Sequence, residues 1–242
     1  MRAAALLVLV ALALTGCETT AEKSARLERA AKALASHRQA AARALTVTSP
    51  SRYVKVLGAT LVHGGQQGAG SAVVVQVRND SARPLRTVPI AIAVRDAAGK
   101  PTYENSEPGL EAALVSIPAL APHAVVSWVD DQVAAGGGRS VTARVGESAT
   151  DSPAALPRTS VSGLHLSEAS GSGEAEGNVA NGSAIPLRNL VVFVTATRAG
   201  RPVAAARAIV SELAPHSSHS FTAVLVGDPR GAQLQAGAPA SG

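Results

Sequence analysis

The sequence predicts a mainly β protein built from two tandem antiparallel β-sandwiches that are preceded by one N-terminal α-helix. Residues 18–45 contain no Gly or Pro and are rich in strong helix formers. After Pro50 the apolar residues are largely β-branched and partly alternate, as strands require. The phrase NDSARPLR at 79–86 returns as NGSAIPLR at 181–188, which indicates that one domain is used twice.

The first sixteen residues have the three regions of a secretory signal. Arg2 supplies a cation, an apolar run follows from Ala3 to Leu14, and small residues come next. The run is too short for a mature membrane span, which needs about 20 apolar residues. LTGC at 14–17 resembles the bacterial lipoprotein lipobox, which implies cleavage before Cys17 and acylation of its thiol. The alternative is a chance cysteine in an ordinary signal peptide.

Cys17 is the only cysteine in the chain. Once it is acylated, no thiol remains for a disulfide or a thiolate metal site, so the exported part must be stable through packing alone. The lipobox implies a diacylglyceryl group on Cys17, and its two acyl chains would hold the protein firmly on a bilayer. We therefore expect a protein of the cell envelope that is lipid-anchored through Cys17 on the extracytoplasmic face of a bacterial membrane.

A helical spacer is predicted over residues 17–46, directly after the anchor. Its six Lys or Arg against three Glu carry much of the net charge of +5. Two interpretations stay open: a helix that contacts anionic headgroups, and a solvated stalk with an ordinary charged face.

Two sets of strand-like segments follow, at 52–147 and at 160–238, and we predict one sandwich from each. A linker rich in Pro, Ser and Ala joins them at 148–159, and a short tail follows at 239–242. These boundaries complete the domain organisation.

Further phrases recur in the same order in both sets. AGKP at 98–101 corresponds to AGRP at 199–202, and LAPH at 120–123 corresponds to LAPH at 213–216. In this register Trp128 corresponds to Phe221, and the second copy lacks the region around YENSEPGLEA. The shared residues are those of strand-to-strand turns, so they predict architecture rather than chemistry.

The stretch from Gly70 to Pro101 resembles the FxLYD type of bacterial extracytoplasmic domain. That pattern has a strand ending in V-x-N, a polar turn, a long strand ending in F-x-L-Y-D, and a later L-x-P-G corner. The resemblance implies an immunoglobulin-like β-sandwich without shared catalytic residues. The first copy has Ile92, Val94, Arg95 and Asp96 at the motif, Phe193 keeps the Phe in the second copy, and His123 and His216 replace the corner Gly.

Candidate sites for metal or catalysis are few. His216 and His219, with His165 from a neighbouring strand, are the candidate metal ligands, but i and i+3 on a strand point to opposite faces. We predict solvent-facing histidines, no metal, no cofactor and no enzymatic activity. The acidic residues Asp130 and Asp131, together with Glu104, Glu107 and Glu111, are predicted to form a solvated sheet edge.

The sequence predicts a non-catalytic binding or scaffolding module of the envelope. Its expected partners are the membrane, through acylated Cys17, and an envelope protein that contacts edge strands or end loops, with strand addition as one route. No nucleic-acid partner is expected because the first sandwich is close to neutral. The alternative is a carrier lipoprotein that delivers a small ligand and therefore needs an apolar pocket. The sequence leaves the oligomeric state open.

Overall fold

The structure is a computed structural model that describes residues 23–24, 26–29, 31–32, 45–64, 70–107, 109–167 and 173–241. Residues 23–24, 26–29 and 31–32 are helical. The signal, Cys17 and the rest of the predicted 17–46 spacer lie outside the described residues. Among those described, no helix is both long and apolar enough to cross a membrane. The chain divides into two compact units, residues 1–40 and 41–242.

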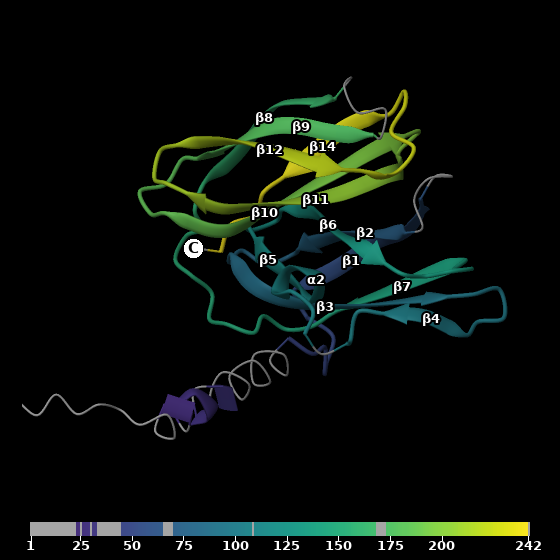
Figure 1. Ribbon diagram of the computed structural model, residues 1–242, viewed down its shortest axis with the longest axis horizontal. Helices are drawn as coiled ribbons and strands as arrows, with labels where there is room; N and C mark the ends of the chain where they lie inside the picture. The colour runs from purple at the N-terminus through teal and green to yellow at the C-terminus, as the bar shows by residue number, and fades with distance from the viewer. Residues whose placement is uncertain are drawn as a thin grey trace, which may run out of the picture. The chain divides into compact units, whose positions relative to one another are not determined.

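The larger unit is mainly β with antiparallel pairing, so the predicted fold class is confirmed (Figure 1). In the first copy the elements are β1 (Val54–His63), β2 (Ser71–Asn79), β3 (Leu85–Arg95), β4 (Pro101–Glu104), α2 (Ala112–Val115), β5 (Ser116–Leu120), β6 (Val125–Val133) and β7 (Ser140–Val145). In the second copy they are β8 (Thr159–Leu166), β9 (Glu174–Asn181), β10 (Leu187–Arg198), β11 (Arg201–Leu213), β12 (Ser218–Val224), β13 (Val226–Gly227) and β14 (Gln233–Gly237).

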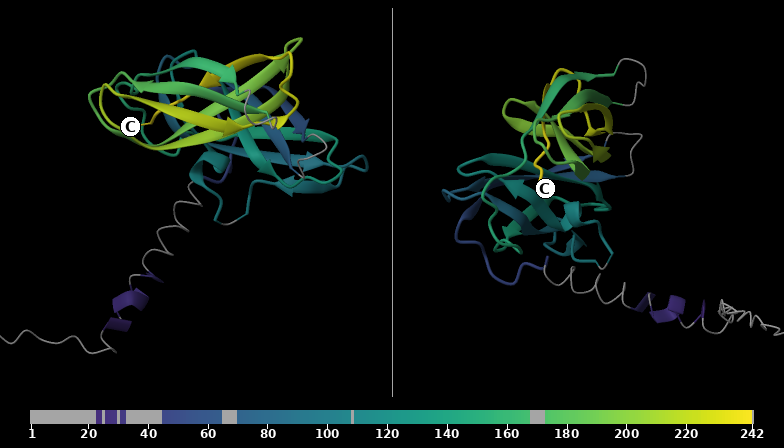
Figure 2. Two further views of the ribbon diagram at one scale, coloured as in Figure 1. Left: turned by 45° about the horizontal axis from the view of Figure 1, so that its top comes forward. Right: turned by 90° about the vertical axis from the view of Figure 1, so that its left-hand side faces the viewer.

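The strands of the described residues form four sheets, two in each copy. The first copy has β1-β2-β6 in one sheet, and β3 in the other with β4, β5 and β7 paired to it. The second copy repeats this plan with β8-β9-β12 and with β13-β11-β10-β14. Figures 1 and 2 show the sheets stacked in four layers, with the β1-β2-β6 sheet of the first copy against the β10-β11 sheet of the second.

The two inner sheets, β1-β2-β6 and β13-β11-β10-β14, each pack against another sheet on both faces. In β10, successive side chains enter two different cores. Val191 and Phe193 belong to a hydrophobic core that consists mainly of first-copy residues. Val192 and Val194, whose side chains point the other way, belong to the core of the second copy. The two copies therefore share a core and do not sit as separate beads on a linker.

The repeated phrase forms the same hydrogen bonds twice, around one buried asparagine in each copy. The Asn79 Nδ2 donates, at 2.8, 3.3 and 3.1 Å, to the carbonyl oxygens of Arg83, Leu120 and Ala121. The Asn181 Nδ2 donates, at the same three distances, to the carbonyl oxygens of Ile185, Leu213 and Ala214. The phrase recurs because each sandwich needs this corner to join three segments of backbone.

The segment missing from the second copy is an excursion between β4 and β5. In the second copy, the continuous strand β11 pairs along β10 at the corresponding place. In the first copy Asn105 bridges the gap: its Oδ1 accepts from the amide of Ile92 at 2.8 Å, and its Nδ2 donates to the carbonyl of Ile90 at 3.0 Å. One buried amide side chain thus replaces the interrupted ladder.

The strand register corrects one correspondence between the copies. Ile92 pairs with Ala143 on β7, and it is Val194, not Phe193, that pairs with Ala236 on the corresponding strand β14. Alignment on the Gly turns AGKP and AGRP places Phe193 opposite Ile92, but β10 has 12 residues where β3 has 11. Phe193 therefore lies on the face of its sheet opposite to Val194, the counterpart of Ile92, and points toward the first copy.

Candidate functional site: a cleft between the two copies

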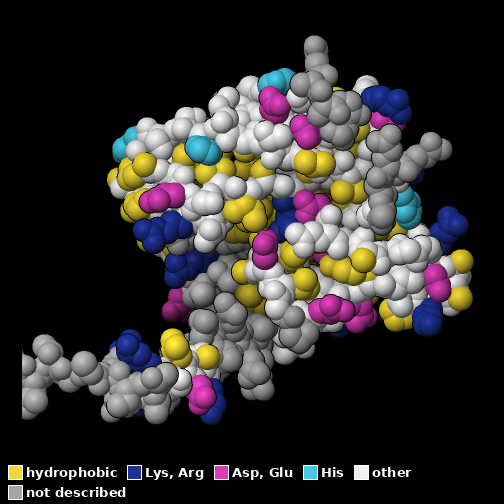
Figure 3. Space-filling model, viewed as in Figure 1, with side chains coloured by type: hydrophobic (Ala, Val, Ile, Leu, Met, Phe, Trp, Pro, Cys, Tyr) yellow, Lys and Arg dark blue, Asp and Glu magenta, His cyan; other side chains and the backbone are white. Residues whose placement is uncertain are grey.

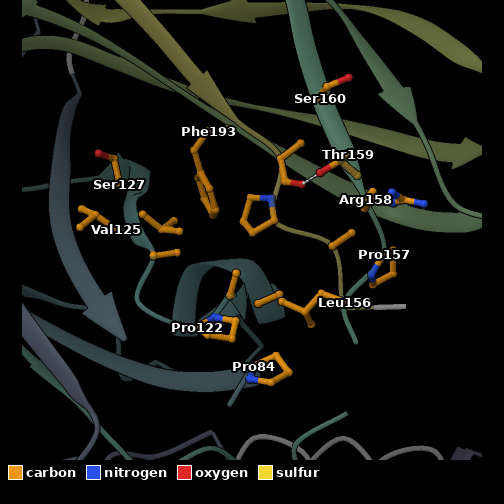
Figure 4. Close-up of a pocket in the computed structure, with 18 of the residues that line it drawn as sticks. Pro84, Pro122, Val125, Ser127, Leu156, Pro157, Arg158, Thr159, Ser160 and Phe193 are labelled. Carbon is orange, nitrogen blue, oxygen red and sulfur yellow. Dashed lines mark hydrogen bonds between the residues drawn. The ribbon is translucent and has the colours of Figure 1, made fainter. Parts of the chain in front are cut away.

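A cavity with a volume of about 1000 Å³ lies between the two copies (Figure 4). Three parts of the chain form its walls: turns and the start of β6 in the first copy, the connection 154–160, and parts of β10 and β14 with the residues after β14. Its apolar lining includes Pro84, Pro122, Val125, Leu156, Pro157, Phe193 and Pro239.

The walls are apolar because the turns that build them are made of Ala and Pro. Residues 121–124 close a β-turn in which the amide of Ala124 donates to the carbonyl of Ala121 at 3.2 Å. Pro122 takes the second position, and His123 takes the third with φ +57°, as in a type II turn. The turn thus presents Pro122 to the cleft.

The connection between the copies is fixed to both of them and forms one wall. The Ser148 Oγ donates to the carbonyl of Arg86 at 2.6 Å, which ties the connection to β3 of the first copy. The Thr159 Oγ1 donates to the carbonyl of Ala238 at 2.6 Å, and the amide of Gly182 donates to the carbonyl of Arg158 at 2.8 Å. This wall of the cleft is therefore part of the folded body.

Arg158 is the only charged residue among those that line the cleft. Its side chain is exposed, and its guanidinium forms no hydrogen bond or ion pair with the described residues. Figure 4 shows the Phe193 side chain directed into the cavity and the Arg158 guanidinium at its border, turned away from the centre. The cleft therefore has an apolar interior and a positive charge at its mouth.

A buried charged contact lies elsewhere on the boundary between the copies. The Arg207 side chain on β11 is 3% exposed, and its Nε donates to the Asp131 Oδ1 on β6 at 2.8 Å. The Glu111 Oε2 lies 3.7 Å from the Arg207 Nη1. On the face drawn in Figure 3, basic and acidic side chains adjoin among hydrophobic ones in the middle of the molecule.

The prediction of a solvated acidic edge is wrong for Asp130 and Asp131. Asp130 is fully buried, and its Oδ2 accepts from the Tyr103 hydroxyl at 2.8 Å. Burial raises the pKa of the Asp130 carboxyl, and burial together with the charge of Asp130 raises the pKa of the Tyr103 hydroxyl. Arg207 of the second copy covers Asp131, while Tyr103 of the first copy covers Asp130, and the sequence pattern of one strand reveals neither contact. Glu104, Glu107 and Glu111 are exposed.

The candidate metal ligands His165, His216 and His219 are all exposed. His216 lies in a turn with φ +54°, and His219 lies on β12. The Nε2 of His165 lies 3.8 Å from the Glu176 Oε2. Within the described part of the chain, no three His, Cys, Asp or Glu side chains come together as a metal site.

The cleft was not predicted, although the chain contains a signal for the packing that forms it. VVVQV at 73–77 and LVVFV at 190–194 are nearly continuous apolar runs, and such runs are typical of strands buried on both faces. They fall on β2 and β10, in the two inner sheets. Two-sided burial implies that the copies pack together, and the cleft arises at the border of that packing.

No protein-family model matches the sequence, and no curated protein matches it. The lipobox at Cys17 and the resemblance to the FxLYD type stay predictions.

Proposed function

We propose that the protein is a non-catalytic binding protein of the bacterial envelope, anchored through acylated Cys17, that holds its ligand in the cleft between its two sandwiches. The observation that carries this proposal is the apolar cavity of about 1000 Å³. Its volume lies at the upper end of the range typical of ligand sites, about 300–1,000 Å³. The lining contains no Cys, His, Asp, Glu or Lys, so it offers no general base or activated nucleophile for catalysis.

The cleft favours the carrier over the scaffold among the two roles that the sequence leaves open. A scaffold acting through edge strands needs no cavity, whereas a carrier needs an apolar pocket with a few polar groups. Val125 and Leu156 supply apolar surface here, and Thr159 and Thr195 supply hydroxyl groups. The shared core supports this role because it joins the copies that form the two sides of the cleft.

Anchoring is tested by replacing Cys17 with Ser in the full chain. Without the thiol no acyl group can be attached, so we expect the protein to move from the membrane fraction to the soluble fraction. A Cys17→Ser protein that stays on membranes at the wild-type level would refute the acyl anchor.

Binding in the cleft is tested with a photo-crosslinking amino acid introduced at Val125 in intact cells. Val125 lines the cleft and is 53% exposed, so the probe fits without disturbing the core. The matched control is Val224 on β12, which is 61% exposed and does not line the cleft. We expect a discrete crosslinked product from position 125 alone. The same products from both positions, or none from either, would count against the cleft as the binding site.

A further inference from the structure

We propose that the cleft takes the acyl chain of a lipid with an anionic headgroup, and that Arg158 contacts the headgroup at the mouth. This inference rests on the proposed function and names the ligand class of the same site. It follows from two properties of the lining, which are its proline-rich, mainly apolar composition and its unbalanced positive charge.

The composition of the cleft favours a hydrocarbon chain over a peptide. Pro84, Pro122, Pro157 and Pro239 all line it, and proline has no backbone N–H to donate. Most other lining residues are Ala, Val, Leu or Phe. A peptide that entered would bring an N–H and a C=O at every residue, and burying them without partners is costly. An acyl chain brings no such groups, so it fits these walls without that cost.

The charge of the cleft favours an anionic headgroup. No lining residue is acidic, and the exposed guanidinium of Arg158 has no carboxylate partner among the described residues. Arg83, also exposed, lies between the lining residues Ala82 and Pro84. A chain held against Phe193 would leave its headgroup at the border of the cavity, where Arg158 lies. Arginine donates well to the oxygens of phosphate and carboxylate groups.

The source of the ligand follows from the proposed anchor. A protein held at the membrane surface by acyl chains meets lipids at high local concentration. A cleft that selects an acyl chain with a negatively charged headgroup would therefore take its ligand from the bilayer that holds the protein.

The test is a binding titration with the full-length Cys17→Ser protein, which carries no acyl group of its own. The probes are lysophosphatidylglycerol, which is anionic, and lysophosphatidylcholine with the same chain, both below their micelle concentrations. We expect one lipid to bind per protein, with tighter binding of the anionic probe. An absence of binding by both probes would overturn the inference.

Two variants with matched controls separate chain from headgroup. Val125→Asp places a charge on the apolar wall and should lower the affinity for both probes by about tenfold or more. The control Val224→Asp should leave both affinities unchanged. Arg158→Gln should lower only the affinity for the anionic probe, by about threefold to fivefold, as expected for the loss of one exposed ion pair. The control Arg201→Gln should leave both affinities unchanged. All four positions are exposed, so the fold should be retained. Unchanged binding by Val125→Asp, or an unchanged preference in Arg158→Gln, would contradict the proposal.

The outcome also separates this inference from the proposed function. If neither lipid binds while the probe at Val125 still gives its crosslinked product in cells, the ligand class is wrong and the cleft remains a binding site. If the crosslinked product is missing as well, both proposals fail.

Discussion

Asp131 on β6 and Arg207 on β11 join the two copies through two hydrogen bonds. The Arg207 Nε donates to the Asp131 Oδ1 at 2.8 Å, and the Arg207 amide donates to the Oδ2 at 2.9 Å. The Arg207 side chain is 3% exposed and the Asp131 side chain is 17% exposed, so the contact is largely shielded from water. Because the aspartate binds both backbone and side chain, it fixes how β6 lies on β11.

Replacing Asp131 with Ala should destabilise the protein by about 3–5 kcal/mol, because it leaves the buried Arg207 guanidinium without its main partner. The measurement is the free energy of unfolding in urea. The control is Asp228→Ala, which breaks the exposed pair with Arg230 and should change the unfolding free energy far less, because water screens exposed charges. Equal costs for the two substitutions would show that the contact between the copies is not specially stabilising.

The double variant Asp131→Leu with Arg207→Met removes both charges from the same boundary. Apolar side chains of similar volume often replace a buried pair without loss, so most of the stability lost in Asp131→Ala should return. A double variant as unstable as Asp131→Ala would mean that geometry, rather than an unpaired charge, sets the cost.

Asn79 and Asn181 should each be indispensable to their copy. Substitution by Ala leaves three carbonyl groups without their donor, so we expect a loss of about 2–4 kcal/mol from the unfolding free energy at either position. The control is Asn178→Ala on β9, an exposed asparagine, which should change stability by less than about 0.5 kcal/mol. A small loss at Asn79 with a large one at Asn181 would show that the repeated corners are not equivalent.

The two LAPH corners contain a strained residue that glycine should relieve. His123 and His216 have φ of +57° and +54°, a conformation that costs a side chain about 1–2 kcal/mol. Glycine loses more conformational freedom on folding, so each His→Gly substitution should give a net gain of about 0.5–1 kcal/mol in thermal unfolding. His219→Gly on β12 serves as the control and should destabilise. A loss at both corners would refute the strain argument.

The stability of the protein should depend on pH through Asp130. Burial raises the pKa of this carboxyl in the folded state, so the folded protein holds the proton more tightly than the unfolded chain. The stability it contributes is therefore complete below the unfolded pKa of about 4 and declines as pH rises through the raised pKa. Asn accepts from the amide of Gln132 as Asp does, and it does not ionise.

Asp130→Asn should therefore gain stability relative to the wild type as pH rises from about 4 to neutrality. The measurement is the unfolding free energy of both proteins over this range. Tyr103, Arg207 and Asp131 also influence this carboxyl, but both proteins share them, so the difference isolates Asp130. Parallel stability profiles would show that Asp130 does not titrate between the folded and unfolded states in this range.

Local chemistry made most of the sandwich plan predictable from sequence. Asn79, Pro122 and Trp128 have counterparts in the second copy because turn geometry and strand alternation repeat with the domain. The packing of the copies was not predictable in this way, because Asp131 and Arg207 lie 76 residues apart. A charge at a strand end has the same pattern whether water or another sheet covers it. The continuous apolar runs of β2 and β10 indicate that the copies pack together, but they do not indicate which residues meet, so the cleft could not be placed from the sequence.

The central claim is that the two copies form one body, because the cleft between them exists only when they are joined. Trp128, the only tryptophan in the chain, is fully buried in the first copy and reports its unfolding by fluorescence. Amide exchange at Val192 and Val194 reports the second copy. We expect both probes to show one urea transition with a common midpoint. Two separate midpoints would contradict the claim and would leave the cleft without a fixed shape.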